Sequence, residues 1–477
     1  MRKINSIFVL LLSLLAFCAC EKDKTASMVL SRTALYFAGW NAPEQSVRYV
    51  ATNAESVAVA TISDGWTYEL DKSTCEIRVT PTGDNSGDNS SLQTSGVLSV
   101  NAISKGGEAS SYYINLYIAD EVEADAEGAA NCYVITTPNQ AYSFDVKHKP
   151  NGEEIDTQSV RLLWQSKTSI IHNVDYKDGR VLFYVADSSE DNTKVEEANA
   201  VIAAYNGDDT ILWSWHLWVT NENPCDDTAT YSNNRVFMTR NLGSFGSSNG
   251  SADTELIHDS YGLYYQWGRK DPFPRPKYHD CSEADLETRY DSNGYYLTEF
   301  AYSVKDGYGT MAFAVGNPMV YIINDGGDWL SEPNGALWSD DVKSVYDPCP
   351  YGWRVPTADD LSVLTLADVE DNTSLDIARK QYGWHLTDQN GTKFFYSACG
   401  FLRYIDGKVQ NMNHKEGVYP STPEPWEGHY WTSSATADGK AKSLYFDLTT
   451  TRTNINKFST DHPDRRANGK QIRCVKM

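Results

Sequence analysis

Short runs that alternate apolar and polar residues fill the chain from residue 28 to residue 119. The runs at 46–50, 66–70 and 75–79 place an apolar residue at every second position, which predicts half-buried β-strands. Between the runs lie stretches rich in Gly, Asn, Asp and Ser, which favour turns. Because no helical period interrupts this pattern, residues 28–119 are predicted to form a β-sandwich.

A second group of apolar runs follows a linker of mainly acidic residues at 120–128. It predicts a second β-sandwich over residues 129–220, with strands at 159–164, 179–185, 199–205 and 211–219. An Asn-Gly pair between the last two runs favours a hairpin. The last run contains Trp213, Trp215 and His216, which suit either a carbohydrate platform or a packed core. Since the run is apolar on both faces, we interpret it as core.

From about residue 233 the pattern changes to many aromatic residues, long loops and short helical segments. Helices are predicted at 282–290 and after Thr357, whose hydroxyl can cap a helix that carries Leu361 and Leu364. Seven of the thirteen tryptophans lie in this part, which indicates an aromatic core. The third module is therefore predicted to be a loop-rich α+β domain that covers residues 221–477.

The beginning of the chain has the composition of an export signal. Arg2 and Lys3 precede an apolar run at 4–17, which is too short to span a bilayer of roughly 30 Å. A small residue directly before Cys20 resembles the bacterial lipobox. This resemblance implies that the signal peptide is residues 1–19 and that Cys20 is acylated after cleavage. The alternative is an ordinary secretory signal with an incidental Cys20.

Residues 20–27 are predicted to form a flexible tether, because every residue in this range after Cys20 is charged or small. Acidic residues just after the lipidated cysteine resemble the surface-export signal of Bacteroidetes lipoproteins. The predicted location is therefore the outer membrane, with the protein anchored by lipid and facing the cell exterior.

The charge of the chain limits its partners. It has 41 Lys and Arg against 64 Asp and Glu, a net charge of −23. Loss of Arg2 and Lys3 with the signal leaves 39 − 64 = −25. Such an acidic chain lacks the basic surface that nucleic acid requires, so we exclude nucleic acid as a partner.

Six motifs occur in order in the C-terminal half. They are found at 238–243, 261–273, 347–357, 394–403, 430–434 and 469–476. Together they resemble the Fibrobacter succinogenes major paralogous domain family. The resemblance implies a C-type-lectin-like fold and a surface or fimbria-associated protein, and the family has no established catalytic residues. The first module likewise resembles the immunoglobulin-like modules of Bacteroidetes surface proteins.

Export to an oxidising compartment permits disulfide bonds. Cys349 precedes the Gly-Trp-Arg-Val-Pro-Thr motif, and Cys474 lies at the end of the last expected strand. We expect these two to pair, because the bond would tie the chain terminus to the centre of the domain. Pairing of Cys225 with Cys281 is a weaker proposal. Cys399 is predicted to be buried and free.

The tripeptide from Glu332 to Asn334 resembles the calcium- and sugar-binding motif of C-type lectins. The Trp338 segment comes too soon after it to be the companion strand motif, so an ordinary turn at the intervening proline is the preferred interpretation. In the ligand-binding interpretation, the candidate residues are Glu332, Asn334 and Trp338, together with Trp426 and Trp431 as aromatic contacts. Calcium is then the one candidate cofactor, and no metal site is otherwise predicted.

The Arg-Val-Pro-Thr motif at 354–357 is also similar to one in formylglycine-generating enzymes. Those enzymes need two closely placed reactive cysteines, and neither Cys399 nor Cys474 lies in such a motif. The sequence contains no nucleophile elbow, phosphate-binding loop or paired zinc signature. We therefore predict that the protein is not an enzyme, with the oxidase as a remote alternative.

The sequence thus predicts a non-catalytic surface lipoprotein that acts in adhesion or ligand binding, as an accessory or tip subunit of a fimbria. Its partners would be the membrane, through the lipid, and an unknown glycan, surface protein or fimbrial subunit. The alternative is a glycan-binding lipoprotein of a polysaccharide-uptake system, which calls for an exposed row of aromatic rings.

Overall fold

The chain forms two compact units, residues 1–120 and residues 121–477, and each is considered by itself. The computed structural model describes residues 25–40, 42–83, 94–185, 187–188, 193–278, 286–297, 302–304, 307–338, 342–366, 372–412, 426–448 and 458–477. Strands are the main regular element of the described residues, which also contain four short helices. The prediction of mainly-β sandwich modules followed by a loop-rich α+β part is confirmed.

The first unit is a sandwich of two four-stranded sheets. One sheet has the order β1 (Ser27–Leu30), β3 (Gln45–Thr52), β6 (Glu76–Pro81), β5 (Trp66–Asp71). The other has the order β2 (Ala34–Ala38), β8 (Ala109–Ala119), β7 (Ser95–Ile103), β4 (Ser56–Ile62). In β6, Ile77 and Val79 are buried in a core that also contains Leu35 and Leu98, whereas the residues between them face outward. The alternation read from the sequence is therefore the division between core and solvent.

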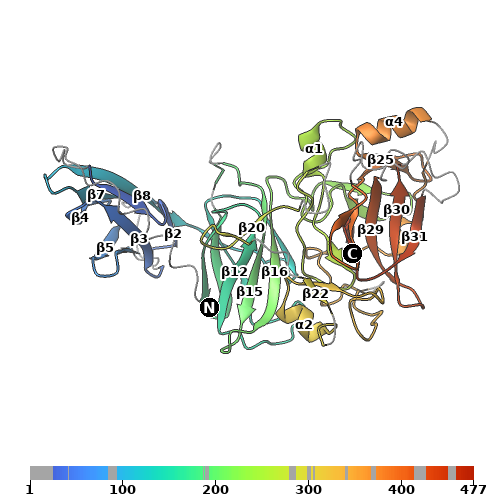
Figure 1. Cartoon of the computed structure of the whole chain (residues 1–477), viewed down its shortest axis with the longest axis horizontal. Coiled ribbons are helices and arrows are strands. Elements are labelled where there is room, and N and C mark those ends of the chain that lie inside the picture. Colours follow the sequence, from blue (N-terminus) through green and yellow to red (C-terminus); the bar gives the residue numbers. More distant parts are fainter. Residues whose placement is uncertain are drawn as a thin grey trace, which may run out of the picture. The chain divides into compact units, whose positions relative to one another are not determined.

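The second unit begins with another sandwich (Figure 1). Its larger sheet has the order β10 (Cys132–Ile135), β16 (Ile211–Val219), β15 (Ala198–Tyr205), β12 (Ser159–Gln165), β20 (Arg289–Tyr290), β21 (Tyr296–Leu297). Its smaller sheet has the order β13 (Ile171–Lys177), β14 (Arg180–Val185), β11 (Gln140–Asp145), β9 (Glu121–Glu123). Because β20 and β21 come from beyond residue 220, the second and third predicted modules share one sheet and one compact unit.

The rest of the second unit consists of short strands joined by long loops. One four-stranded sheet has the order β17 (Thr228–Thr230), β18 (Val236–Met238), β33 (Val475–Lys476), β24 (Trp353–Arg354). A second has the order β19 (Tyr265–Gln266), β32 (Gly469–Lys470), β27 (Phe401–Leu402), β28 (Val409–Gln410). Smaller sheets contain β29 (Glu427–Ala435), β30 (Ala441–Asp447), β31 (Phe458–Asp464); β22 (Tyr302–Val304), β23 (Tyr321–Ile323); and β25 (Gly383–Thr387), β26 (Lys393–Ser397). The helices are α1 (Thr254–Asp259), α2 (Met311–Gly316), α3 (Ala358–Leu361) and α4 (Asn372–Lys380).

The two predicted helices have different outcomes. Thr357 caps α3 as expected, but the helix ends at Leu361, before Leu364. The helix predicted at 282–290 is wrong in its described part, because Arg289–Tyr290 is strand β20; residues 279–285 lie outside the described residues. Strand β20 pairs with β12, which lies far back in the chain, and with β21, which follows it. This pairing outweighs the local helical pattern. Within the described ranges, no helix has the length and apolar character needed to cross a bilayer.

The aromatic run in β16 is core, as interpreted from the sequence. Trp213, Trp215 and His216 are all buried. The indole Nε1 of Trp213 donates to Asn131 Oδ1 at 3.0 Å, and an Nε2–H on His216 can donate to Asn199 Oδ1 at 2.9 Å. Burial lowers the pKa of His216 to about 3, so the imidazole is neutral and structural. None of the three rings is available as a carbohydrate platform.

The predicted bond between Cys349 and Cys474 is present, and both residues are fully buried. Cys399 is buried and free, as expected. Cys225 also has a free thiol, so its proposed bond to Cys281 is not formed; Cys281 itself lies outside the described residues. The second unit is therefore cross-linked between the loop that precedes β24 and the residue directly before β33.

Replacement of both Cys349 and Cys474 by Ser should lower the free energy of unfolding by about 4–5 kcal/mol, because the bond closes a long loop. The two residues are 125 positions apart in the sequence. Urea denaturation of oxidised wild type and the double variant measures the difference, with Cys225→Ser as the matched control. Equal midpoints for wild type and double variant would contradict a stabilising role of the bond.

Candidate functional site

The residues predicted to bind a ligand do not form one site. Trp338 and Trp431 are buried, and their Nε1 atoms donate to Tyr346 O at 3.0 Å and Tyr265 O at 2.8 Å. The prediction that these two rings contact a ligand is therefore corrected: they pack in the core. Trp426 is partly buried beside a different core cluster, with its ring centroid 4.8 Å from that of Tyr382.

Glu332 and Asn334 are exposed on a loop. The side chain of Asn334 accepts a hydrogen bond from Ala336 N at 2.9 Å, which closes a local turn. This contact agrees with the turn interpretation of the tripeptide. Among the residues that the structure describes, no three His, Cys, Asp or Glu side chains converge as metal ligands do.

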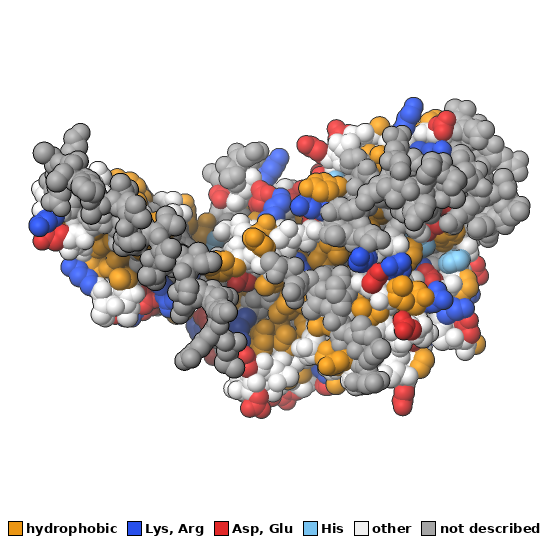
Figure 2. Space-filling model, in the orientation of Figure 1, with side chains coloured by type: hydrophobic (Ala, Val, Ile, Leu, Met, Phe, Trp, Pro, Cys, Tyr) orange, Lys and Arg blue, Asp and Glu red, His pale blue; other side chains and the backbone are white. Residues whose placement is uncertain are grey.

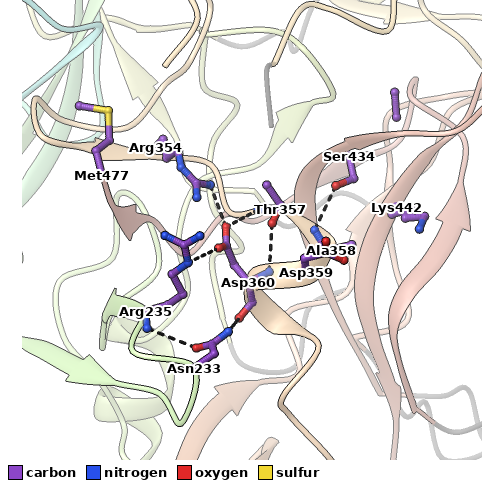
Figure 3. A pocket seen from close by; sticks show the side chains of 11 residues that line it. Asn233, Arg235, Arg354, Thr357, Ala358, Asp359, Asp360, Ser434, Lys442 and Met477 are labelled. Atoms are coloured by element: carbon purple, nitrogen blue, oxygen red, sulfur yellow. Dashed lines mark hydrogen bonds and ion pairs between the residues drawn. The ribbon is translucent and has the colours of Figure 1, made fainter. Parts of the chain in front are cut away.

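A hydrophilic cavity of about 740 Å³ opens elsewhere in the C-terminal part, beside helix α3 (Figure 3). It is lined by Asn233, Arg235, Arg354, residues 357–360, Ser434, Ala435, Lys442 and Met477. These residues come from segments that are far apart in the sequence. Three of the segments meet in one sheet, because β33 pairs with both β18 and β24.

The start of α3 forms one wall of the cavity. Thr357 and Asp360 form a capping box, in which Asp360 N donates to Thr357 Oγ1 at 3.0 Å and Thr357 N donates to Asp360 Oδ2 at 2.8 Å. Ala358 N donates to Ser434 Oγ at 3.1 Å and so ties the helix to β29. The helix N-terminus is thus held rigidly by neighbouring segments.

Asp360 is the central charge of the cavity, and Figure 3 shows it between two arginines. Its Oδ2 lies 2.8 Å from Arg354 Nη1, and its Oδ1 lies 2.9 Å from Arg235 Nε. Burial opposes ionisation of Asp360, but the hydrogen bonds from Arg354 and Thr357 outweigh it, and the pKa of the carboxyl is lowered. Asp360 is therefore a carboxylate that positions both guanidinium groups.

Among the described residues, the cavity retains hydrogen-bond donors without a full set of partners. Arg235 is 51% exposed and contacts Asp360 through Nε, which leaves its terminal nitrogens towards solvent. Lys442 Nζ lies 3.8 Å from Asp461, a distance too long for a strong hydrogen bond. The lining side chains carry three positive charges, on Arg235, Arg354 and Lys442, against two negative charges. The excess is notable in a chain of net charge −23.

Figure 2 shows acidic and basic side chains interspersed over the visible face, with no single large basic patch. A cavity with more basic than acidic side chains is therefore a local feature of the surface. Such a site attracts a carboxylate, sulfate or phosphate group, and the planar guanidinium of Arg235 suits two-point contact with an oxyanion.

Sequence reasoning found part of this cavity and missed the rest. It identified the motif at 354–357 and the cap at Thr357, but assigned them structural roles. Asn233, Arg235 and Lys442 were not singled out, because their approach to α3 depends on pairing between distant strands. The one available signal was an Asp three residues after Thr357 and six after Arg354.

The oxidase alternative is not supported by the positions of its thiols. Cys399 is fully buried, and Cys474 is both fully buried and bonded to Cys349. Burial raises the pKa of the Cys399 thiol to about 11, which disfavours the reactive thiolate. These two residues therefore do not provide a pair of reactive thiols in an open cleft.

No protein-family model matches the chain, and no curated protein matches it. Similar solved structures include the SGBP-B protein of the Bacteroides ovatus mixed-linkage glucan utilization locus, in complex with a mixed-linkage heptasaccharide (11% identity, 41% of this chain, 48% of that chain, TM-score 0.15). Another is the human desmocollin-1 ectodomain (12% identity, 40% of this chain, 39% of that chain, TM-score 0.15). A third is the N-terminal Ig1-2 module of the Drosophila receptor protein tyrosine phosphatase DLAR (13% identity, 41% of this chain, 99% of that chain, TM-score 0.15). The chain spans less than half of the first two, and TM-scores this low carry no argument about function.

Asp360→Asn should lower the free energy of unfolding by about 2–4 kcal/mol, because it leaves the buried Arg354 guanidinium without its counter-charge. Asp359→Asn, at the exposed neighbouring position, should change stability by about 0.5 kcal/mol or less. Chemical denaturation followed by circular dichroism measures both. Similar values for the two variants would show that Asp360 does not organise this cavity.

Proposed function

We propose that the protein is a non-catalytic lipoprotein of the bacterial outer membrane, exposed to the exterior, that acts in adhesion or ligand binding. The observation that carries the binding proposal is the hydrophilic cavity beside α3, with its excess of basic side chains in an acidic chain. Adhesion and ligand binding both need such a preformed site on a stable scaffold, and neither needs a reactive group.

The ligand of this cavity is proposed to present an anionic group, a carboxylate or a sulfate, carried by a glycan or by a surface protein. Arg235 and Lys442 would contact this group, because their charges are partly exposed and only partly neutralised. Arg354 lies deeper, is 7% exposed and is already engaged by Asp360. Its role would be to position Arg235 through the shared carboxylate.

The proposed location rests on the N-terminal signal, which precedes the first described residue. The export signal and Cys20 support lipid anchoring, and the acidic tether supports display on the outer face. The resemblance of residues 221–477 to the Fibrobacter succinogenes major paralogous domain supports a role as an accessory or tip subunit of a fimbria. The polysaccharide-uptake alternative is weakened by the burial of its two expected aromatic contacts, because Trp431 is fully buried and Trp426 is partly buried.

Binding by the cavity can be tested with the whole mature chain on a microarray of neutral, uronic-acid and sulfated glycans, alongside immobilised acidic peptides. We expect binding to acidic probes. Replacement of both Arg235 and Lys442 by Ala should weaken this binding about tenfold or more, because two charge-assisted contacts are lost. Lys440→Ala is the matched control, since Lys440 lies two residues from Lys442 and does not line the cavity. Equal loss in the control, or no binding to any acidic probe, would refute the proposal.

Anchoring can be tested separately by Cys20→Ala. Without the acylated cysteine, the protein should lose incorporation of labelled palmitate and move from the membrane fraction to the soluble fraction. Protease treatment of intact cells should degrade the wild type but spare a periplasmic lipoprotein control. Retention of the variant in the membrane fraction would contradict lipid anchoring at this residue.

A further inference from the structure

A second cavity, of about 590 Å³, lies in the other part of the same unit, between the loop that follows β12 and strand β20. It is lined by residues 166–170, Asp187, Glu196 and Tyr290. Apart from Ile170 and the tyrosine ring, its walls are made of hydroxyl and charged side chains. None of these residues belongs to the cavity beside α3.

An aromatic surface continues from this cavity. Tyr290 of β20 pairs directly with Tyr296 of β21, so both side chains lie on the same face of the hairpin. Tyr290 is part of the cavity wall, and Tyr296 next to it is 65% exposed. Neither hydroxyl makes a hydrogen bond within the described residues. One half-buried ring, Tyr290, and one exposed ring, Tyr296, thus lie side by side at the cavity, although burying the second would stabilise the fold.

The hairpin that carries these rings is held in place. The carboxylate of Asp291 accepts hydrogen bonds from Asn293 N at 2.8 Å and Tyr295 N at 2.9 Å, which closes the turn between the two strands. Gln165 Nε2 donates to Asp291 O at 3.4 Å. The strands that carry Tyr290 and Tyr296 are therefore held by the turn and by β12.

The loop that forms the opposite wall is also ordered. Gln165 Oε1 accepts hydrogen bonds from Ile170 N and Ile171 N, each at 3.1 Å. These bonds hold together the two ends of the loop at residues 166–169. Within this segment Ser169 has a φ of 61°, a left-handed conformation that is unfavourable for a residue other than Gly. Its cost is offset by the same hydrogen bonds. The cavity is preformed, as expected for a binding site.

We propose that this cavity and the Tyr290–Tyr296 face bind a neutral saccharide chain. A sugar ring has an apolar face of C–H groups, which stacks on an aromatic ring, and a rim of hydroxyls, which bind carboxylates and hydroxyls. The structure offers both: two adjacent rings, and Ser166, Asp187 and Glu196 in the cavity wall. One oxygen of Asp187 accepts from Asn139 and one oxygen of Glu196 pairs with Lys167, and each carboxylate keeps further acceptor positions for a ligand. A protein partner is less well matched, because six of the eight lining residues are Ser, Thr or charged, whereas the core of a protein interface is depleted of charged residues.

Calorimetric titration of the whole mature chain with cellohexaose, xylohexaose, laminarihexaose and mannohexaose tests this assignment. At least one hexaose should bind, and Tyr296→Ala should weaken its binding about tenfold, the effect of losing one stacked ring. Tyr296→Phe should retain most of the affinity, because the ring remains. Tyr113→Ala is the matched control: it removes an exposed strand tyrosine of the first unit.

Tyr290 is half-buried, so Tyr290→Ala is informative only if its thermal unfolding matches wild type; the exposed Tyr296 keeps the test valid in either case. Absence of binding to all four hexaoses overturns the proposal, as does equal affinity of Tyr296→Ala and the control. The Arg235 and Lys442 double variant should bind the hexaose normally. Failure of this proposal and failure of the anionic-ligand proposal are therefore distinguishable.

Discussion

The second unit depends on one segment, residues 469–476, which lies between parts of the chain that are otherwise distant. Its strand β32 pairs with β19 and β27, and its strand β33 pairs with β18 and β24. Between the two strands, Gln471 accepts from Gly262 N at 3.0 Å and donates to Gly262 O at 2.9 Å, and Cys474 bonds to Cys349. The cavity beside α3 exists because β33 lies between β24, the strand of Arg354, and β18, the strand that follows Arg235, and pairs with both.

This arrangement explains which features could be predicted from the sequence. The sandwich strands follow a local period of two, and the cap at Thr357 needs only the next three residues, so both were predicted correctly. Strand β20 was predicted as helix, because its pairing with β12 and β21 is not visible in its own residues. Trp338 and Trp431 were candidate ligand contacts, since a tryptophan in a loop-rich domain suits a core or a binding face equally. Only their neighbours in space decide between the two.

The positions of the buried Lys and Arg side chains in the second unit also could not be predicted from the sequence. Several Lys and Arg side chains are buried there, each over an aromatic ring: Arg466 lies 4.4 Å from the Trp267 centroid, Lys470 4.5 Å from Trp431, and Arg473 3.9 Å from Tyr396. Arg473 also donates to Phe395 O at 2.8 Å, and Lys470 lies 2.6 Å from Asp464. Among the described residues the same unit also buries seven Asp and Glu side chains, so the buried cations are largely balanced by buried carboxylates. The charge of the surface therefore stays close to that of the composition.

If the protein is anchored by a lipid and binds a ligand beside α3, as we propose, the disulfide has a mechanical consequence. Arg354, Asp360 and Lys442 all lie between Cys349 and Cys474, inside a covalently closed loop, whereas Arg235 lies outside it. Tension that enters from the N-terminal side reaches Arg235 first. It can pull that residue away from Asp360 by opening the pairing of β18 with β33, but the closed loop limits how far the other three can separate. The contacts to a bound anion would then be lost in sequence, that of Arg235 before that of Lys442. The covalent loop would resist extension until its disulfide bond was reduced.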